Sequence, residues 1–133
     1  MRLALLTRMP DPTDRQSLGK HGELLARLEL ERRGYAILAT RFRTRFGEID
    51  LVCSHEGTIV FVEVKTRRSL KYGSAAEAVT PWKRRRIAAM ALDYLAWHEQ
   101  LNHRCRFDVV AIDGIGTDRT AIRVIEDAFQ VDG

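Results

Sequence analysis

The run TIVFVEVKT at residues 58–66 constrains the fold more than any other segment, because its β-branched and aromatic side chains predict a β-strand. Both faces of this strand begin apolar, which indicates a strand covered on both sides. A carboxylate and an ammonium near the end of such a strand are costly to bury unless they pair or bind a metal. Glu63 and Lys65 therefore indicate either a structural ion pair or a functional site. Alternation puts them on one face with Ile59 and Phe61, opposite Val60, Val62 and Val64.

The segments around this strand predict an α/β domain in the order helix, three strands, helix, and one or two strands. Good helix formers over residues 20–33 predict the first helix, which Gly34 ends. Strands are expected over residues 35–43, 48–54 and 58–66, and the short connections between them imply an antiparallel meander. Thr80 and Pro81 begin a second long helix. Its inward face should carry Ile87, Met90, Ala91, Tyr94, Leu95 and His98, and strands should follow over residues 106–113 and 121–129.

The chain of 133 residues suits one domain, expected over residues 19–133. Residues 1–18 contain two prolines and no periodicity, so they predict a loosely ordered N-terminal extension. The apolar stretch Leu3 to Leu6 is too short for a signal peptide or a membrane span. Cys53 and Cys105 match no zinc spacing and fit a reducing compartment. We expect a cytoplasmic protein that does not act at a membrane.

Asp50 is the third residue that points to chemistry. The short connection from Val52 to Ile59 lays the segment EIDLV beside the central strand, so that Asp50 can come close to Glu63. Two adjacent carboxylates repel each other, and a divalent cation is the usual relief. Ligands that are all oxygen favour Mg²⁺ or Mn²⁺ over zinc. With Lys65 beside them, Asp50 and Glu63 would hold a metal that lowers the pKa of an attacking water, as phosphodiester hydrolysis requires, and no small-molecule cofactor is expected.

Basic side chains gather in one part of the chain, although the net charge is only +4. Residues 65–86 contain eight basic side chains and one acid, whereas residues 108–133 contain six acids and two arginines. This asymmetry suits a positive face that binds a polyanion, most simply DNA; the alternative is a solvated charged surface. The candidates for phosphate contacts are Arg41, Arg43, Arg45, Arg67, Arg68, Lys71 and Lys83. Trp82 and Trp97 are expected to pack rather than to stack on bases, and Asp108 to hydrogen-bond Arg106 or a helix end.

The tracts GEID at 47–50 and FVEVKTR at 61–67 resemble the (E/D)-x-K signature of the restriction-endonuclease-like superfamily. Together with Gly22-Glu23, Gly34-Tyr35, Gly73, TPWKRRRI and RFDVV, they resemble the uncharacterised bacterial YraN-like family over residues 19–112. The resemblance implies a restriction-endonuclease-like core, with a mixed central sheet flanked by helices. Archaeal Holliday-junction resolvases of this superfamily carry a further glutamate on the first helix, which Glu23 matches. Ile49 stands where the superfamily often has a proline before its first acid.

The leading hypothesis is a metal-dependent nuclease acting on DNA, including branched or damaged DNA in repair or recombination. Its catalytic candidates are Glu23, Asp50, Glu63 and Lys65. A second hypothesis is a nucleic-acid-binding or repair-accessory module that has the nuclease fold but no turnover. A third is a protein-interaction or structural subunit whose acids and lysine form a buried network. Nucleases that cut both strands often pair two copies, so a homodimer stays open.

Overall fold

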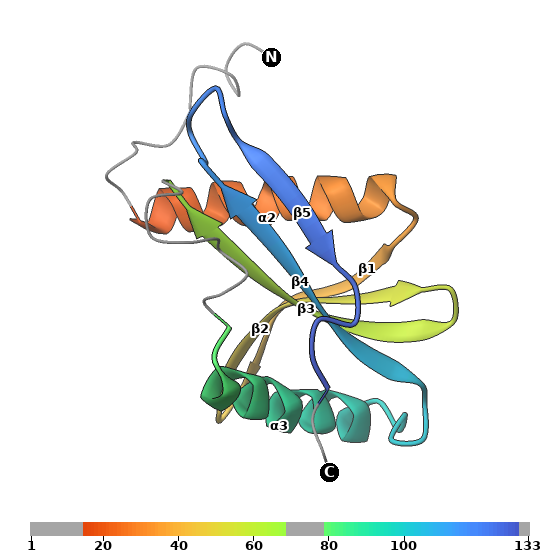
Figure 1. The fold of residues 1–133 in the computed structure, drawn as a ribbon. Coiled ribbons are helices and arrows are strands. Elements are labelled where there is room, and N and C mark those ends of the chain that lie inside the picture. Colours follow the sequence, from red (N-terminus) through yellow and green to blue (C-terminus); the bar gives the residue numbers. More distant parts are fainter. Residues whose placement is uncertain (1–14, 69–78, 131–133) are drawn as a thin grey trace.

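The computed structural model describes residues 15–68 and 79–130, which form two helices and five strands (Figure 1). The order α-β-β-β-α-β-β agrees with the order expected from the sequence. The elements are α2 (Arg15–Arg32), β1 (Ala36–Thr44), β2 (Gly47–His55), β3 (Thr58–Arg67), α3 (Pro81–Trp97), β4 (Cys105–Asp113) and β5 (Ala121–Ile125).

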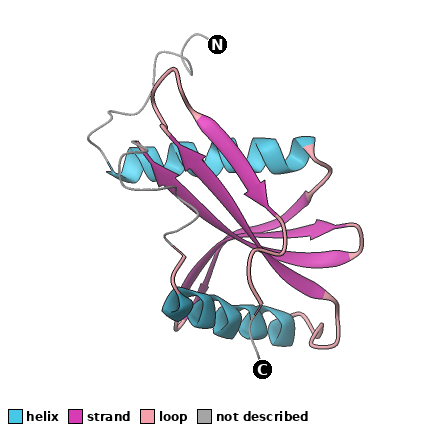
Figure 2. Cartoon of the chain, in the orientation of Figure 1, coloured by secondary structure: helices cyan, strands magenta, loops and turns pink. Residues whose placement is uncertain are grey.

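The strands, magenta in Figure 2, form one mixed sheet. Their order in the sheet is β1-β2-β3-β4-β5. Strands β1, β2 and β3 are an antiparallel meander, as expected from their short connections. Strand β4 pairs with β3 in parallel, because the connection between them includes the helix α3 and returns the chain in the same direction. Strand β5 closes the sheet antiparallel to β4. The α/β class and the mixed sheet are thus confirmed.

One helix lies on each side of the sheet, so that β3 is covered on both faces (Figure 1). We call these the α2 face and the α3 face. On the α2 face, Ala26 and Leu30 of the helix pack against Val60 and Val62 of β3. On the α3 face, the core is formed by Ile49, Val52, Ile59, Phe61, Val79, Ile87, Met90, Ala91, Tyr94, Leu95, Val109 and Phe129. The alternation expected for β3 is therefore observed in its apolar half.

Helix α2 begins at Arg15 rather than at Lys20, so the expected domain boundary at Gly19 falls inside it. The physical reason is Leu18, which is buried in the core of the α2 face and extends the helix toward the N-terminus. Residues 1–14 lie outside the described part of the chain. The helix ends as expected at Gly34, whose φ of +92° is the left-handed conformation that glycine adopts readily.

Helix α3 begins at the predicted cap, where the Thr80 side chain accepts the Lys83 backbone N–H at 3.3 Å. Five of the six residues expected on its inward face are buried. His98 is the exception: it caps the exposed end of the helix, with Nδ1 2.8 Å from the carbonyl oxygen of Tyr94. The expectation that the tryptophans pack is also wrong, because Trp82 is 57% and Trp97 81% exposed.

Asp108 has the structural role expected of it, as the centre of a buried polar network. Its carboxylate accepts hydrogen bonds from the Tyr35 hydroxyl at 2.7 Å, from Arg106 Nε at 3.0 Å and from the Asp127 backbone N–H at 2.9 Å. Arg106 Nη2 also lies 2.8 Å from Nδ1 of His55. Because a guanidinium can only donate, His55 must accept at Nδ1. We call these four side chains, Tyr35, His55, Arg106 and Asp108, the Asp108 network.

None of the helices described over residues 15–68 and 79–130 is both long and apolar enough to cross a membrane.

Candidate functional site

Asp50 lies where strand β2 reverses its alternation. Ile49 and Val52 both pack in the core of the α3 face, whereas Leu51 and Cys53 pack in the core of the α2 face. The ladder between β2 and β3 runs from His55–Thr58 to Leu51–Val62. Just beyond it, Asp50 Oδ2 accepts the backbone N–H of Val64 at 2.8 Å. The carboxylate of Asp50 thus lies between the two strands and takes up an N–H of β3.

Glu63 lies close enough to Asp50 to change its protonation. Burial and the Glu63 carboxylate raise the pKa of Asp50 from its ordinary 3.8 to about 7, and the Val64 N–H only partly offsets them. Because one proton relieves the repulsion, a divalent cation in the same position would relieve it as well. The structure therefore brings Asp50 and Glu63 together, as the sequence predicted from the short hairpin.

Lys65 completes the group by pairing with Glu63. Its Nζ is 3.1 Å from Glu63 Oε1, and the two side chains are 23% and 16% exposed. Burial by itself would lower the pKa of Lys65, but Glu63 outweighs it and raises the pKa. Lys65 in turn lowers the pKa of Lys83, on helix α3, through close contact between the two amino groups. Lys83, one of the predicted phosphate contacts, thus lies at the site.

Two small clefts flank these residues. A cleft of about 140 Å³ on the α3 side, which we call the lysine cleft, is lined by Glu48, Glu63, Lys65, Lys83, Arg86, Ile87 and Met90. A second cleft, of about 210 Å³, is lined by Gly19, Glu23, Arg41, Glu48, Asp50, Val64 and Thr66. Glu48 lines both clefts. Glu48 and Arg86 are not among the residues predicted from the sequence. Glu48 is two residues before Asp50 on the same strand, which is the signal that could have indicated it, whereas a run of four basic residues does not show which of them face the strands.

Glu23 reaches the second cleft because helix α2 approaches β3 closely. A Cβ at Gly22 would overlap the methyl group of Thr66, so a larger residue would require Thr66 or the helix to shift. Glu23 Oε2 lies 3.1 Å from Arg41 Nε, and Glu23 is 17% exposed. Arg41 has a φ of +51°, an uncommon backbone conformation for a residue other than glycine. Glu23 therefore stands beside Asp50 with a cation as its partner.

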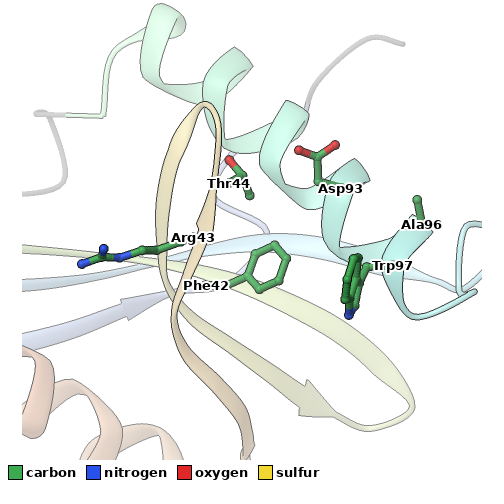
Figure 3. A pocket seen from close by; sticks show the side chains of 6 residues that line it. All are labelled: Phe42, Arg43, Thr44, Asp93, Ala96 and Trp97. Carbon is green, nitrogen blue, oxygen red and sulfur yellow. The ribbon is translucent and has the colours of Figure 1, made fainter.

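The other predicted phosphate contacts are spread more widely. Arg43 Nε pairs with Glu48 at 2.7 Å, and Figure 3 shows it pointing away from Phe42 and Trp97. The guanidinium of Arg45 lies 4.9 Å from the ring of Phe46. Arg67 and Arg68 line a separate cleft of about 310 Å³ with Leu18, Thr66 and Ile115. Lys71 lies outside the described residues.

Within residues 15–68 and 79–130, no group of three or more His, Cys, Asp and Glu side chains is arranged to hold a metal ion. Asp50 and Glu63 would therefore supply two ligands at most. A magnesium ion commonly takes one or two carboxylates and completes its shell with water and substrate phosphate. The pair fits such an ion, since burial and the Glu63 carboxylate together raise the pKa of Asp50, and a bound cation would favour its charged form.

Comparison with known proteins gave one family and many close relatives. Residues 22–112 match the sequence model of the uncharacterised protein family UPF0102. A UPF0102 protein of Syntrophus aciditrophicus is 46% identical, over 85% of this chain and 88% of the relative. One of Geotalea uraniireducens is 44% identical, over 93% and 98%. One of Rhodococcus opacus is 45% identical, over 85% and 96%.

Proposed function

Since the chain belongs to the uncharacterised protein family UPF0102, the YraN-like family expected from its motifs, we propose its function from its own site: a metal-dependent nuclease that hydrolyses phosphodiester bonds in DNA. One observation carries the proposal. Asp50 and Glu63 share a partly buried position in which the pKa of Asp50 rises to about 7, and Lys65 is paired with Glu63 at 3.1 Å. Adjacent carboxylates with an ammonium beside them suit a hydrolytic metal site.

Asp50 and Glu63 are the residues that would hold Mg²⁺ or Mn²⁺. When bound, the ion would lower the pKa of an attacking water and neutralise charge on the phosphate. The backbone N–H of Val64 holds Asp50 Oδ2 in place at 2.8 Å, so that one carboxylate is fixed before a metal arrives. A ligand fixed in advance loses less entropy on binding.

Lys65, Lys83 and Arg86 are the positive groups of the lysine cleft. Lys65 Nζ would orient the attacking water and stabilise charge that gathers on the phosphate in the transition state. Lys83 and Arg86 come from helix α3 and would bind phosphates on the α3 side of the cut. The second cleft, on the other side of Asp50, is lined by side chains of both charges: Glu23, Arg41 and Glu48. These side chains would limit the directions from which DNA can approach Asp50.

The fold is compatible with the restriction-endonuclease-like core that the motifs imply. It has the expected element order, and the two carboxylates and the lysine lie on adjacent antiparallel strands. Branched or damaged DNA in repair or recombination is the substrate class we propose on this analogy, with action in the cytoplasm. A homodimer would allow both strands to be cut, and sedimentation of the purified protein would reveal it.

Cleavage assays with the purified protein test the proposal. With Mg²⁺ or Mn²⁺, the wild type should cut at least one of supercoiled, linear, single-stranded and branched DNA. Glu63→Gln and Lys65→Ala should each abolish cutting, whereas Asp118→Asn, an exposed acid in the loop before β5, should not affect it. The proposal fails if no form of DNA is cut, or if both site variants cut like the wild type.

A non-catalytic nucleic-acid-binding module is the second candidate. The observation in its favour is that two of the four catalytic candidates are already neutralised: Glu63 by Lys65 and Glu23 by Arg41. Such a module would bind DNA with a strong dependence on salt and would keep that binding in Asp50→Asn. Metal-dependent cutting by the wild type would rule it out.

A further inference from the structure

We propose that Trp82 and Arg86 form a stacking platform for an unpaired nucleobase beside the lysine cleft. This inference rests on the proposed function, because it names the feature of the nucleic acid that the same site would select. The selected substrate would carry a single-stranded or extrahelical nucleotide next to the phosphate held in the cleft.

Trp82 is an aromatic side chain that the fold leaves in solvent. It is the second residue of α3 and is 57% exposed, whereas the buried face of the helix is formed by Ile87, Met90, Ala91, Tyr94 and Leu95. Exposing an indole gives up the stabilisation that burial would provide. Among the described residues, Trp82 belongs to neither buried core.

Arg86 connects this indole to the lysine cleft. One helical turn after Trp82, its guanidinium lies 4.8 Å from the centre of the indole ring. The same Arg86 lines the lysine cleft with Glu63, Lys65 and Lys83. Gly47 makes room for it, because a Cβ there would lie 2.7 Å from Arg86 Nη2. The Arg86 side chain therefore contacts the Trp82 ring and also lines the lysine cleft.

The charge around Trp82 favours a nucleobase over an apolar partner. Lys65, Lys83 and Arg86 line the cleft, and the guanidinium of Arg86 also lies against the Trp82 ring. An apolar protein surface would have to desolvate these charges, which is costly. A nucleotide instead brings a phosphate to the cations and a flat π-face to the indole. Because bases inside a duplex are already stacked on their neighbours, only an unpaired base can offer that face.

Trp97 provides a matched control from the same helix. It ends α3 and is 81% exposed, and it lines a groove of about 440 Å³ with Phe42, Asp93 and Ala96 (Figure 3). The rise of a helix separates it from Trp82 by about 22 Å along the axis. These are the two tryptophans of the chain, so each can be studied alone by replacing the other with phenylalanine.

Binding measured without divalent metal, in the presence of a chelator, isolates the platform from cleavage. Three labelled DNAs would be compared: a single strand, a duplex with one extrahelical base, and the continuous duplex. Trp82→Ala should weaken binding to the first two by about fivefold or more, from the usual contribution of one stacked base, and binding to the continuous duplex by less than about twofold. Trp82→Phe should retain most of the binding, and Trp97→Ala should match the wild type.

Fluorescence gives a readout that a merely structural role would not change. In Trp97→Phe, single-stranded DNA should quench the remaining Trp82, and the continuous duplex should quench it much less. The inference is overturned if Trp82→Ala binds all three DNAs like the wild type, if it loses the same factor on all three, or if single strands do not quench Trp82. Metal-dependent cutting lost in Glu63→Gln would then still support the nuclease, while selective quenching without any cutting would support the platform alone.

Discussion

Asp50→Asn should make the metal-free protein more stable at neutral and alkaline pH, although it removes a candidate metal ligand. The folded protein holds the Asp50 proton more tightly than the unfolded chain does, because burial and Glu63 raise the pKa from 3.8 to about 7. The contribution of Asp50 to the free energy of unfolding therefore falls as pH rises from about 4 to about 7, and it stays constant above that range. An asparagine stays neutral and can still accept the Val64 N–H through its side-chain oxygen.

The size of the effect follows from the two pKa values. A tenfold change in proton affinity is about 1.4 kcal/mol, so the difference between 3.8 and about 7 sets an upper limit of about 4 kcal/mol above pH 7. Partial contact with water at the two clefts reduces this figure, and we expect a gain in the free energy of unfolding of about 1–3 kcal/mol at pH 8. Below pH 4, where Asp50 is protonated in both states, the two proteins should be equally stable.

Urea denaturation in the presence of a chelator, at pH 4, 6 and 8, measures this difference. Asp118→Asn is the control for removing a negative charge, and it should show no such pH dependence. The reasoning is refuted if Asp50→Asn is less stable than the wild type at pH 8, or if its gain in stability is the same at pH 4 and pH 8.

Three further outcomes are expected. Saturating Mn²⁺ should stabilise the wild type in thermal unfolding, by about 2.7 kcal/mol at 100 times the Kd, and should leave Asp50→Asn unchanged; equal stabilisation of both would argue against this site. Asp108→Ala should lower the free energy of unfolding in urea by about 3–5 kcal/mol, because Arg106 is left without its buried partner, and a loss under 1 kcal/mol would contradict this reading of the Asp108 network. Gly22→Ala should cost about 1–3 kcal/mol by forcing α2 away from Thr66, and thermal unfolding that matches the wild type would show that the contact gives way freely.

The part of the site on β3 could be predicted because strand alternation is regular there. The two-residue period of a strand was enough to predict that one face of β3 carries Ile59, Phe61, Glu63 and Lys65. The turn at Glu56 and Gly57 then sets the hairpin that brings Asp50 close to Glu63. The fold class followed in the same way from short connections and one long helical crossover.

The reversal at Asp50 could not be predicted, because it depends on backbone conformation. Arg41, which lies between the pairs Thr40–Leu51 and Phe42–Ile49 and so opposite Asp50, has a φ of +51°. Neither arginine nor aspartate at these positions indicates from the sequence that the alternation of β2 will reverse. Trp82 is a different case, since it precedes Ile87 by five residues and so lies about 140° around the helix. The helical period alone would have predicted that Trp82 lies outside the core. The expectation that Trp82 packs came instead from its large apolar side chain.

The Asp108 network also sets how much of the chain must be synthesised before the fold can be completed. Tyr35 precedes Asp108 by 73 positions, and Asp127, which donates to the same carboxylate, follows it by 19. The hairpin of β2 and β3, with Asp50 and Glu63, can form as soon as residue 67 has left the ribosome, whereas β3 pairs with β4 only after residue 113. A nascent chain would thus expose the acids of the site on an unfinished sheet edge, and residue 127 must emerge before the last hydrogen bond to Asp108 forms.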